Sequence, residues 1–381
     1  MSVKQERRPN QWMSSAVEQV SAQLITDVRS SRISPIKNSA EALERLNAKL
    51  ESIQKYDMYH PGMLPCFAEK QNYRQKGVIY SNQNENVSGF GFNCMQVVPD
   101  GRVFAGTESE LLVIEKSEGV WKSRPVFDLI CKSADYLHVL PGGELLVAST
   151  NTLYHRVEDG GSWNNGHKAP GLGTDQVTCM RALSNGNIIT GHTDHSLKMH
   201  TFKNGKWSES SILEDCMKFK DLLFPCCVEQ SVNGEVFSGN YNGGLYKSSA
   251  YAYRQDEWSN EAIFRHNKAI GNLVLLDRQH VACSSENLVY LSQVNARGNW
   301  DTRLIYRNRN LLSALQALPD GRILFGDTGG DIGILSGANA ERWKSNVLTT
   351  GKSGINCLQA IPDGRIFVAY SDNSIGIIDG D

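Results

Sequence analysis

The sequence predicts an all-β protein, a seven-bladed β-propeller, and three observations support this. Short apolar segments recur along residues 71–381, and the breaks between them are rich in Gly, Asn and Asp, as in β-hairpins. Six tryptophans follow groups of these segments at spacings of 42, 44, 51, 42 and 43 residues. A period of about 40–45 residues with four strands in each repeat is typical of propeller blades.

The clearest repeats share a Pro-Asp-Gly turn between their first two strands, at residues 99–101, 319–321 and 362–364. Degenerate copies carry Pro-Gly-Gly, Ser-Asn-Gly or Val-Asn-Gly in the same place, and the copy around Asp277 has lost its glycine. These turns predict seven blades. In the first six, a tryptophan opens the fourth strand: Trp121, Trp163, Trp207, Trp258, Trp300 and Trp343.

The seventh repeat has only three strands after its first residue, Ile355. Far upstream, the segment "YRQKGVIY" from Tyr73 to Tyr80 matches "WDTRLIY", which begins at Trp300. An aromatic residue opens each segment, a polar stretch follows, and an apolar pair with a tyrosine closes it. We therefore expect residues 73–80 to form the outer strand of the seventh blade, because a closed ring leaves no open sheet edge.

One segment near the end of the chain, "PDGRIFVAYSDNSIGIID", resembles a WD-repeat unit, with its Gly-rich first turn and its Asp-containing second turn. Gly191 and His192 resemble the Gly-His dipeptide of that family, although they follow a different strand. The resemblance covers about residues 73–381 and implies the propeller architecture. It implies no particular function, because unrelated functions share such folds.

Residues 1–70 are predicted to form a separate helical segment that precedes the propeller of residues 71–381. Apolar residues recur at helical spacing between residues 13 and 28 and again between residues 39 and 56. We expect a helical pair packed on the propeller. A coiled-coil arm, through which the chain would self-associate, is the alternative.

The charge balance argues against a nucleic-acid partner and against membrane insertion. The chain has 39 basic and 41 acidic residues, and its formal net charge is −2. No apolar run approaches the roughly 20 residues of a membrane helix. Nine cysteines without a CxxC spacing, together with an N-terminus that lacks a secretory signal, predict reduced thiols and a cytoplasmic location.

The first strands of the blades place polar residues at one level near the propeller axis. On each of these strands the polar residue lies two positions after a residue that is mostly small and apolar. In the fifth blade, an apolar residue near Val274 occupies the equivalent position. The polar residues are Gln96, His138, Arg181, Glu229, Gln316 and Gln359. Buried polar groups need partners, so the ring predicts either hydrogen bonds between blades or a ligand site in a central channel.

No catalytic residue, metal site or cofactor is predicted. The sequence contains neither a phosphate-binding Gly-rich loop before a helix nor a GxSxG elbow. His192, His195 and His200 lie close together in the sequence, but they fall on a hairpin turn in which Asp194 aligns with Asp372. A tight turn explains this pattern better than a metal centre does.

The longest spacing between tryptophans contains an insertion between the third and fourth strands of the fourth blade. It carries Tyr251, Tyr253 and Arg254. Tyr and Arg are favoured anchors of protein interfaces, and functional residues concentrate in loops on rigid scaffolds. We expect these three residues to contact a partner.

Together these features favour a non-enzymatic interaction scaffold that binds a protein or peptide on one propeller face. One alternative is a small-molecule-binding, hydrolase-type or lyase-type propeller that uses the central channel. The mainly glutamine ring argues against it, because such enzymes gather carboxylates or histidines at the axis. A second alternative is a bacterial effector that is delivered into a host cell and acts through protein binding.

Overall fold

A computed structural model describes the propeller strands and most of their turns. The described residues are 73–81, 91–98, 100–108, 110–128, 133–140, 144–149, 152–159, 162–165, 175–183, 186–203, 206–213, 224–231, 233–251, 254–277, 279–337, 343–361 and 364–380. All belong to one compact unit, Lys55–Asp381. Within these ranges every regular element is a strand, and no helix there has the length and apolarity to cross a membrane. The predicted helical pair and its boundary at residue 70 lie outside the described residues.

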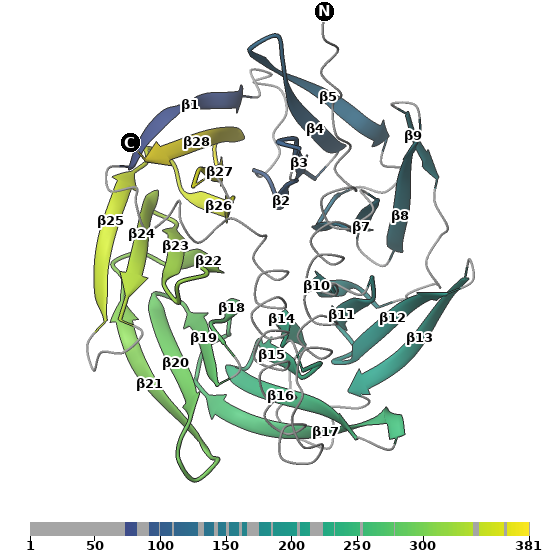
Figure 1. The fold of residues 1–381 in the computed structure, drawn as a ribbon, viewed down its shortest axis with the longest axis vertical. Helices are drawn as coiled ribbons and strands as arrows, with labels where there is room; N and C mark the ends of the chain where they lie inside the picture. Colours follow the sequence, from purple (N-terminus) through teal and green to yellow (C-terminus); the bar gives the residue numbers. More distant parts are fainter. Residues whose placement is uncertain are drawn as a thin grey trace, which may run out of the picture. The chain divides into compact units, whose positions relative to one another are not determined.

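The strands form seven four-stranded antiparallel sheets, which confirms the predicted seven-bladed propeller. In Figure 1 the sheets follow one another around a common axis in sequence order, and the first strand of each blade is innermost. Blade 1 contains β2 (Cys94–Val97), β3 (Val103–Gly106), β4 (Glu110–Ser117) and β5 (Val120–Asp128). Blade 2 contains β6 (Tyr136–Val139), β7 (Leu145–Ser149), β8 (Thr152–Asp159) and β9 (Ser162–Asn165). Blade 3 contains β10 (Val177–Ala182), β11 (Ile188–His192), β12 (Leu197–Lys203) and β13 (Lys206–Leu213).

The next three blades repeat this order. Blade 4 contains β14 (Pro225–Gln230), β15 (Val236–Asn240), β16 (Gly244–Tyr251) and β17 (Arg254–Arg265). Blade 5 contains β18 (Asn272–Leu275), β19 (His280–Ser285), β20 (Leu288–Val294) and β21 (Trp300–Arg307). Blade 6 contains β22 (Leu312–Ala317), β23 (Ile323–Asp327), β24 (Asp331–Ser336) and β25 (Lys344–Thr350).

The seventh blade joins the two ends of the propeller chain. Its first three strands are β26 (Ile355–Ala360), β27 (Ile366–Tyr370) and β28 (Ser374–Gly380). Its outer strand is β1 (Tyr73–Ser81), which pairs antiparallel with β28 from Tyr73 opposite Gly380 to Ser81 opposite Ser374. In Figure 1 the purple-blue β1 lies beside the yellow β28. The predicted closure by residues 73–80 is confirmed.

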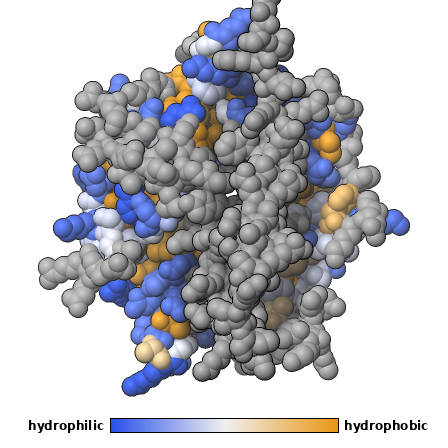
Figure 2. Space-filling view, viewed as in Figure 1, coloured by the Kyte–Doolittle hydropathy of each residue, from blue (hydrophilic) through white to orange (hydrophobic). Residues whose placement is uncertain are grey.

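The second strand of each blade is covered on both faces, so its polar residues, such as Thr190, Asn240 and Asp327, are buried together with its apolar ones. All five residues of β7, β11, β15, β23 and β27 are buried. Outer strands such as β25 are mostly exposed. In the space-filling view, hydrophilic residues cover much of the described surface, with scattered hydrophobic ones between them (Figure 2). Such isolated apolar residues are normal on a protein surface.

The seven hydrophobic clusters of the propeller lie at the seven junctions between blades, and this explains the tryptophan period. In six of them, the tryptophan that lies in or just before one blade's outer strand packs on the preceding blade. Trp163 meets Phe104 edge to face at 5.7 Å between ring centroids, and Trp300 meets Phe237 at 6.0 Å. Such pairs add about 0.5–1.5 kcal/mol to the burial itself. The side chain of Tyr73, the predicted counterpart in blade 7, lies outside the described residues.

Two local interactions stabilise the Pro-Asp-Gly turns. In blade 6, Gly321 has a φ of +83° and donates its N–H to the Leu318 carbonyl at 2.9 Å. Asp320 accepts hydrogen bonds from the backbone N–H and the Nε of Arg322 at 3.1 and 2.7 Å. A left-handed backbone suits glycine, so the glycine recurs wherever this turn does.

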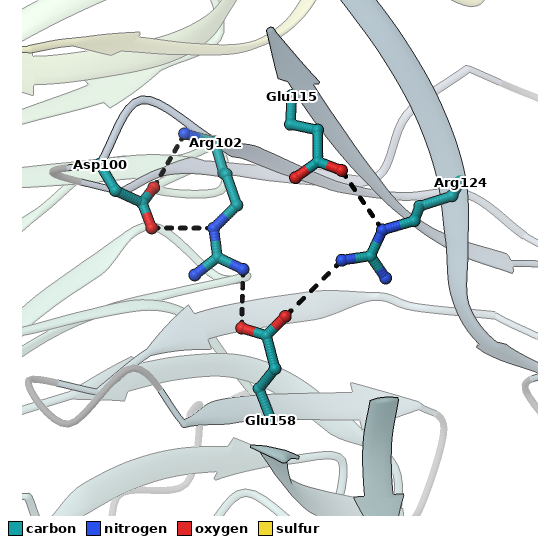
Figure 3. Close-up of polar contacts among 5 residues, drawn as sticks. All are labelled: Asp100, Arg102, Glu115, Arg124 and Glu158. Atoms are coloured by element: carbon teal, nitrogen blue, oxygen red, sulfur yellow. Dashed lines mark hydrogen bonds and ion pairs between the residues drawn. The ribbon is translucent and has the colours of Figure 1, made fainter. Parts of the chain in front are cut away.

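At the junction of blades 1 and 2 the same turn extends into an ion-pair network (Figure 3). Arg102 contacts Asp100 in its own turn at 2.8 Å and Glu158 of β8 at 2.7 Å. Arg124 of β5 contacts the other oxygen of Glu158 at 3.6 Å and Glu115 of β4 at 3.4 Å. Glu158 thus bridges two arginines of the preceding blade, and the network belongs to the blade junction.

Candidate functional site

The predicted axial residues occupy equivalent register positions on the innermost strands. Gln96 pairs with Phe104, Arg181 with Ile189 and Gln316 with Leu324, in each case one residue before the pair next to the turn. Val274 of β18 holds this position in blade 5, opposite Ala282. The sequence therefore predicted the level and its apolar exception correctly.

Three glutamines of this level hydrogen-bond the backbone of the next blade. Gln359 accepts the Val97 N–H at 2.7 Å and donates to the Val97 carbonyl at 3.2 Å. Gln316 makes the same pair of bonds with Ala360, at 2.7 and 3.3 Å. Gln96 accepts the Val139 N–H at 2.7 Å. These bonds join blades 6 to 7, 7 to 1 and 1 to 2, and they include the junction at which the ring closes.

Blades 2, 3 and 4 place ionisable side chains at the same level, here called the axial arc: His138, Arg181 and Glu229. Arg181 Nε lies 3.1 Å from Glu229 Oε2, so this ion pair joins blades 3 and 4. The Arg181 side chain is 39% exposed, whereas that of Glu229 is 16% exposed. Burial, assisted by the Arg181 charge, lowers the pKa of His138 to about 3, so its ring is neutral near pH 7. Burial also raises the pKa of Glu229, and Arg181 opposes that rise.

A second level of contacts between blades lies two residues earlier on the same strands, where the sequence suggested only small apolar packing. Cys94, Cys227 and Cys357 donate their thiols to carbonyls of the next blade, at Ala134, Ile270 and Asn93, over 3.3, 3.4 and 3.5 Å. Tyr136 and Asn272 hold the same position and donate to Thr178 and Leu312. This second level could have been recognised in the sequence, because a side chain able to donate a hydrogen bond (Cys, Tyr or Asn) recurs at one register position.

These thiols are structural. Burial raises the pKa of Cys357 to about 12 and holds the pKa of Cys94 and Cys227 well above the ordinary value of a thiol. A protonated thiol is a poor nucleophile and a poor metal ligand. The second strand leaves room for the sulfur: a Cβ added to Gly106 would lie 2.6 Å from Cys94 Sγ.

The histidines of blade 3 serve a hydrogen-bond cluster and a turn. Thr190 Oγ1 lies 2.8 Å from His192 Nε2 and 2.7 Å from His200 Nε2, and all three side chains are fully buried. His195 takes the left-handed turn position, with a φ of 72°, and Asp194 accepts the Ser196 N–H at 2.9 Å. The predicted tight turn is confirmed. Among the described residues, no three His, Cys, Asp or Glu side chains gather in a group able to hold a metal ion.

The predicted partner-binding residues fall at the tip of the β16–β17 hairpin. The backbones of Tyr251 and Arg254 pair with each other there. Tyr253 and the side chains of all three residues lie outside the described residues. Their role in partner binding stays a prediction.

Comparisons with known proteins agree on the architecture. No family model matches the chain, and no curated protein matches its sequence. The WD40 β-propeller domain of Doa1 is similar, with 15% identity, a TM-score of 0.63, and coverage of 81% of this chain and 97% of that domain. The chain is a WD-repeat-like propeller in fold.

Propeller lyases are similar to the same degree. A streptogramin B lyase shows 13% identity and a TM-score of 0.61, covering 83% of this chain and 99% of its own. Virginiamycin B lyase from Staphylococcus aureus shows 12% identity and a TM-score of 0.60, covering 81% and 99%. At these identities the likeness establishes the fold alone.

Proposed function

We propose that this protein is a non-enzymatic scaffold that binds a protein or peptide partner on its loop face. The loop face is the end of the propeller formed by the turns between second and third strands and by the connections from one blade to the next. The observation that carries the proposal is that most of the axial polar residues bind the neighbouring blade. Three glutamines bind neighbouring backbone, and Arg181 binds Glu229, so most of the polar ring holds blades together.

A ring fixed in this way suits recognition. Its blades are joined by buried clusters at every junction and by hydrogen bonds along the axis. A pre-organised surface loses little conformational entropy when a partner binds, so more of the contact energy appears as affinity. The similar fold of the WD40 domain of Doa1 is consistent with this reading.

A second candidate function rests on the axial arc. Arg181 is partly exposed near the axis, and His138 and Glu229 are ionisable groups in its surroundings. An exposed guanidinium beside a carboxylate is a polar arrangement suited to a small molecule at the axis. The lyase-like fold comparisons make this alternative worth a direct test.

Recovery and titration of a partner separate the two functions. The intact chain is used to recover proteins from its native source, and each candidate is purified and titrated by calorimetry. We expect one protein to bind the wild type and a His138→Ala/Glu229→Gln variant with similar affinity, because the axial arc is not its contact. The β16–β17 hairpin lies at the opposite end of blade 4 from the loop face, so the triple change Tyr251→Ala, Tyr253→Ala and Arg254→Ala tests in the same titration whether the partner contacts that end instead.

Two outcomes would overturn the scaffold proposal. One is that no purified protein binds the intact chain. The other is that a small-molecule fraction raises the melting temperature of the wild type but not that of the His138→Ala/Glu229→Gln variant. The second outcome would assign function to the axial arc.

A further inference from the structure

Three buried polar side chains of blade 3 form a hydrogen-bonded chain on the face that packs against blade 2. Thr190 Oγ1 lies 2.8 Å from His192 Nε2 and 2.7 Å from His200 Nε2, and each of the three residues is 0% exposed. The residues opposite the two histidines in the sheet, Val177 and Ile188, belong to the hydrophobic cluster between blades 2 and 3. Directly opposed side chains share one face of a sheet, so the histidine chain, as we name these three residues, is enclosed in that junction.

A single hydroxyl proton decides how the histidine chain is protonated. Thr190 can donate to one imidazole nitrogen and must accept an N–H from the other. His200 Nδ1 lies 3.8 Å from Glu209 Oε2, so a proton on that nitrogen faces a carboxylate. We therefore assign Nδ1–H to His200, which accepts the Thr190 hydroxyl at Nε2, and Nε2–H to His192. Among the described residues, His192 Nδ1 then has no hydrogen-bond partner, and it is the buried atom at which a further proton would add.

The charges around His192 do not favour that further proton. Burial lowers the pKa of His192 and Lys198 lowers it further, whereas Asp194, Glu209 and Asp175 oppose the shift. Lys198 Nζ lies 3.2 Å from Glu209 Oε1, so this carboxylate already balances a cation. A proton on the His192 ring would place a positive charge in a fully buried site, which is costly.

Blade 2 contributes His155 and Glu144 to the same junction. The His155 ring meets that of Trp207 in blade 3 at 5.8 Å between centroids, and its Nε2 lies 2.6 Å from Glu144 Oε2. Glu144 is therefore engaged by His155. Within the described part of blade 2, no carboxylate forms an ion pair with the histidine chain.

His192 is also the first residue of the β11–β12 turn on the loop face. Its backbone N–H bonds the Ser196 carbonyl at 3.0 Å, and its carbonyl accepts the His195 N–H at 3.1 Å. Thr193 N–H bonds the Gln176 carbonyl at 3.0 Å and joins the turn to the connection before blade 3. Moving the His192 ring from the junction into water therefore displaces the backbone that closes the turn.

The β27–β28 turn of blade 7 is built in the same way, except at this residue. In each turn an aspartate accepts the N–H and the hydroxyl of a serine two positions later: Asp194 with Ser196 at 2.9 and 2.6 Å, and Asp372 with Ser374 at 3.0 and 2.5 Å. Tyr370 holds the place of His192, since both pair with the first residue of the innermost strand. Titration of the aspartates thus acts on both turns, whereas residues 370–374 contain no histidine.

We propose that the histidine chain is an acid-sensitive switch, in which protonation releases His192 from the junction and opens the β11–β12 turn while the ring stays closed. An exposed histidine binds a proton near pH 6.5, and the buried ring binds it only at lower pH. Between these values the open turn alone holds the proton, so falling pH favours opening, by at most about tenfold per pH unit for one histidine. The switch goes beyond the proposed scaffold function, but its turn belongs to the loop face, so acid would alter the surface offered to a partner.

Hydrogen exchange of the intact chain, read by mass spectrometry, compares the two turns in one sample. Peptides covering residues 188–197 and 366–375 are followed from pH 7 to pH 5, and their protection factors are taken relative to the unfolded chain at each pH, so that the intrinsic exchange rate cancels. Circular dichroism at each pH establishes that the ring is folded. The variant is His192→Gln, because glutamine offers Thr190 an uncharged partner that does not titrate. His280→Gln is the matched control, since His280 lies in blade 5 and bonds Asp277 at 2.8 Å.

We expect the protection of the blade 3 turn, relative to that of the blade 7 turn, to fall about tenfold between pH 6.5 and pH 5 in the wild type and in His280→Gln. In His192→Gln the ratio should stay constant within about twofold. If His192→Gln does not fold, His192→Tyr takes its place, because it puts the residue of the blade 7 turn into blade 3.

Two results would overturn the switch. One is a ratio of the two protection factors that stays constant from pH 7 to pH 5 in the wild type, which decides the matter without any variant. The other is a fall of this ratio that persists when His192 is replaced, because another group would then control the turn. Neither result bears on the scaffold proposal, which is tested by partner titration at neutral pH.

Discussion

Glutamine at the axial level shows how one residue type can serve a junction between sheets. Its side-chain amide carries an acceptor, Oε1, and a donor, Nε2, on the same carbon. The two atoms can therefore bind the N–H and the C=O of a single residue in the next blade. Gln359 does this with Val97, and Gln316 does it with Ala360. A backbone N–H that faces the axis would otherwise lack a protein partner, and leaving such a group unsatisfied is costly.

Gln359→Ala should destabilise the propeller by about 1–3 kcal/mol, because it leaves the Val97 N–H and carbonyl without these partners. The free energy of unfolding in urea measures the effect. Gln279→Ala, at an exposed turn residue, is the control and should change stability by less than about 0.5 kcal/mol. Equal stability of the two variants would mean that water replaces the amide at no cost.

The buried histidines of blade 3 should make the protein acid-sensitive. Burial lowers the pKa of His200 to about 4, with Glu209 opposing the shift and His192 and Lys198 adding to it. The unfolded chain would bind a proton near pH 6.5, so between about pH 6.5 and 4 only the unfolded state gains it. The free energy of unfolding should therefore fall as the pH drops through this interval, by at most about 1.4 kcal/mol per pH unit for this residue.

Urea unfolding at several pH values measures this slope. His200→Gln removes the titrating group and should flatten the profile relative to the wild type. A variant with the same slope as the wild type would show that other groups, such as His192 or His138, control the acid response.

At the scale of elements, the closing strand β1 is the only outer strand that comes from a distant part of the sequence. Every other outer strand follows its own blade directly, whereas β1 precedes its partner β28 by almost the whole propeller. Its residues Ile79 and Tyr80 pack on the cluster between blades 7 and 1. The strand thus completes both a sheet and a junction.

Removal of residues 1–82 should leave an open ring that is insoluble or no longer melts cooperatively, because the edge of β28 and an apolar junction are uncovered. Removal of residues 1–60 should leave melting close to that of the full chain. A synthetic peptide covering residues 71–83 should restore the melting transition of the truncated protein, and a scrambled peptide should not. A chain starting at Ser88 that melts at the parent temperature would contradict this role for β1.

At the scale of the whole molecule, closure makes each blade depend on both neighbours. Every hydrophobic cluster contains residues of two adjacent blades. A blade that detaches would expose the apolar surface of two junctions at once. The conformational entropy gained by one freed blade is small compared with the cost of exposing that surface. We expect the ring to unfold as one unit.

Thiols distributed around the ring test this cooperativity. Burial raises the pKa of Cys94, Cys179, Cys227, Cys283 and Cys357, which lie in blades 1, 3, 4, 5 and 7. Alkylation by iodoacetamide, read by mass spectrometry along a urea titration, should give the same midpoint for all five and match the midpoint from circular dichroism. A thiol that reacts at lower urea would identify a blade that opens independently.

The repeat itself was accessible from the sequence because it depends on local chemistry. Turn glycines, apolar runs and the tryptophan period are short-range features, and they predicted seven four-stranded blades. The aromatic residue and apolar pair shared by residues 73–80 and the segment at Trp300 predicted the closing strand as well. Counting back from the turns also placed Gln96, Val274 and Gln359 at one level.

The use of those residues was decided by tertiary structure. Whether Gln359 meets a ligand or the backbone of Val97 depends on how two sheets meet, across 262 positions of sequence, and no local pattern contains that geometry. The thiol bonds arise in the same way, since each joins one blade to the next. Local propensities therefore determine the blades, whereas the contacts between blades follow from the packing angle and register of neighbouring sheets, which appear only when the ring is closed.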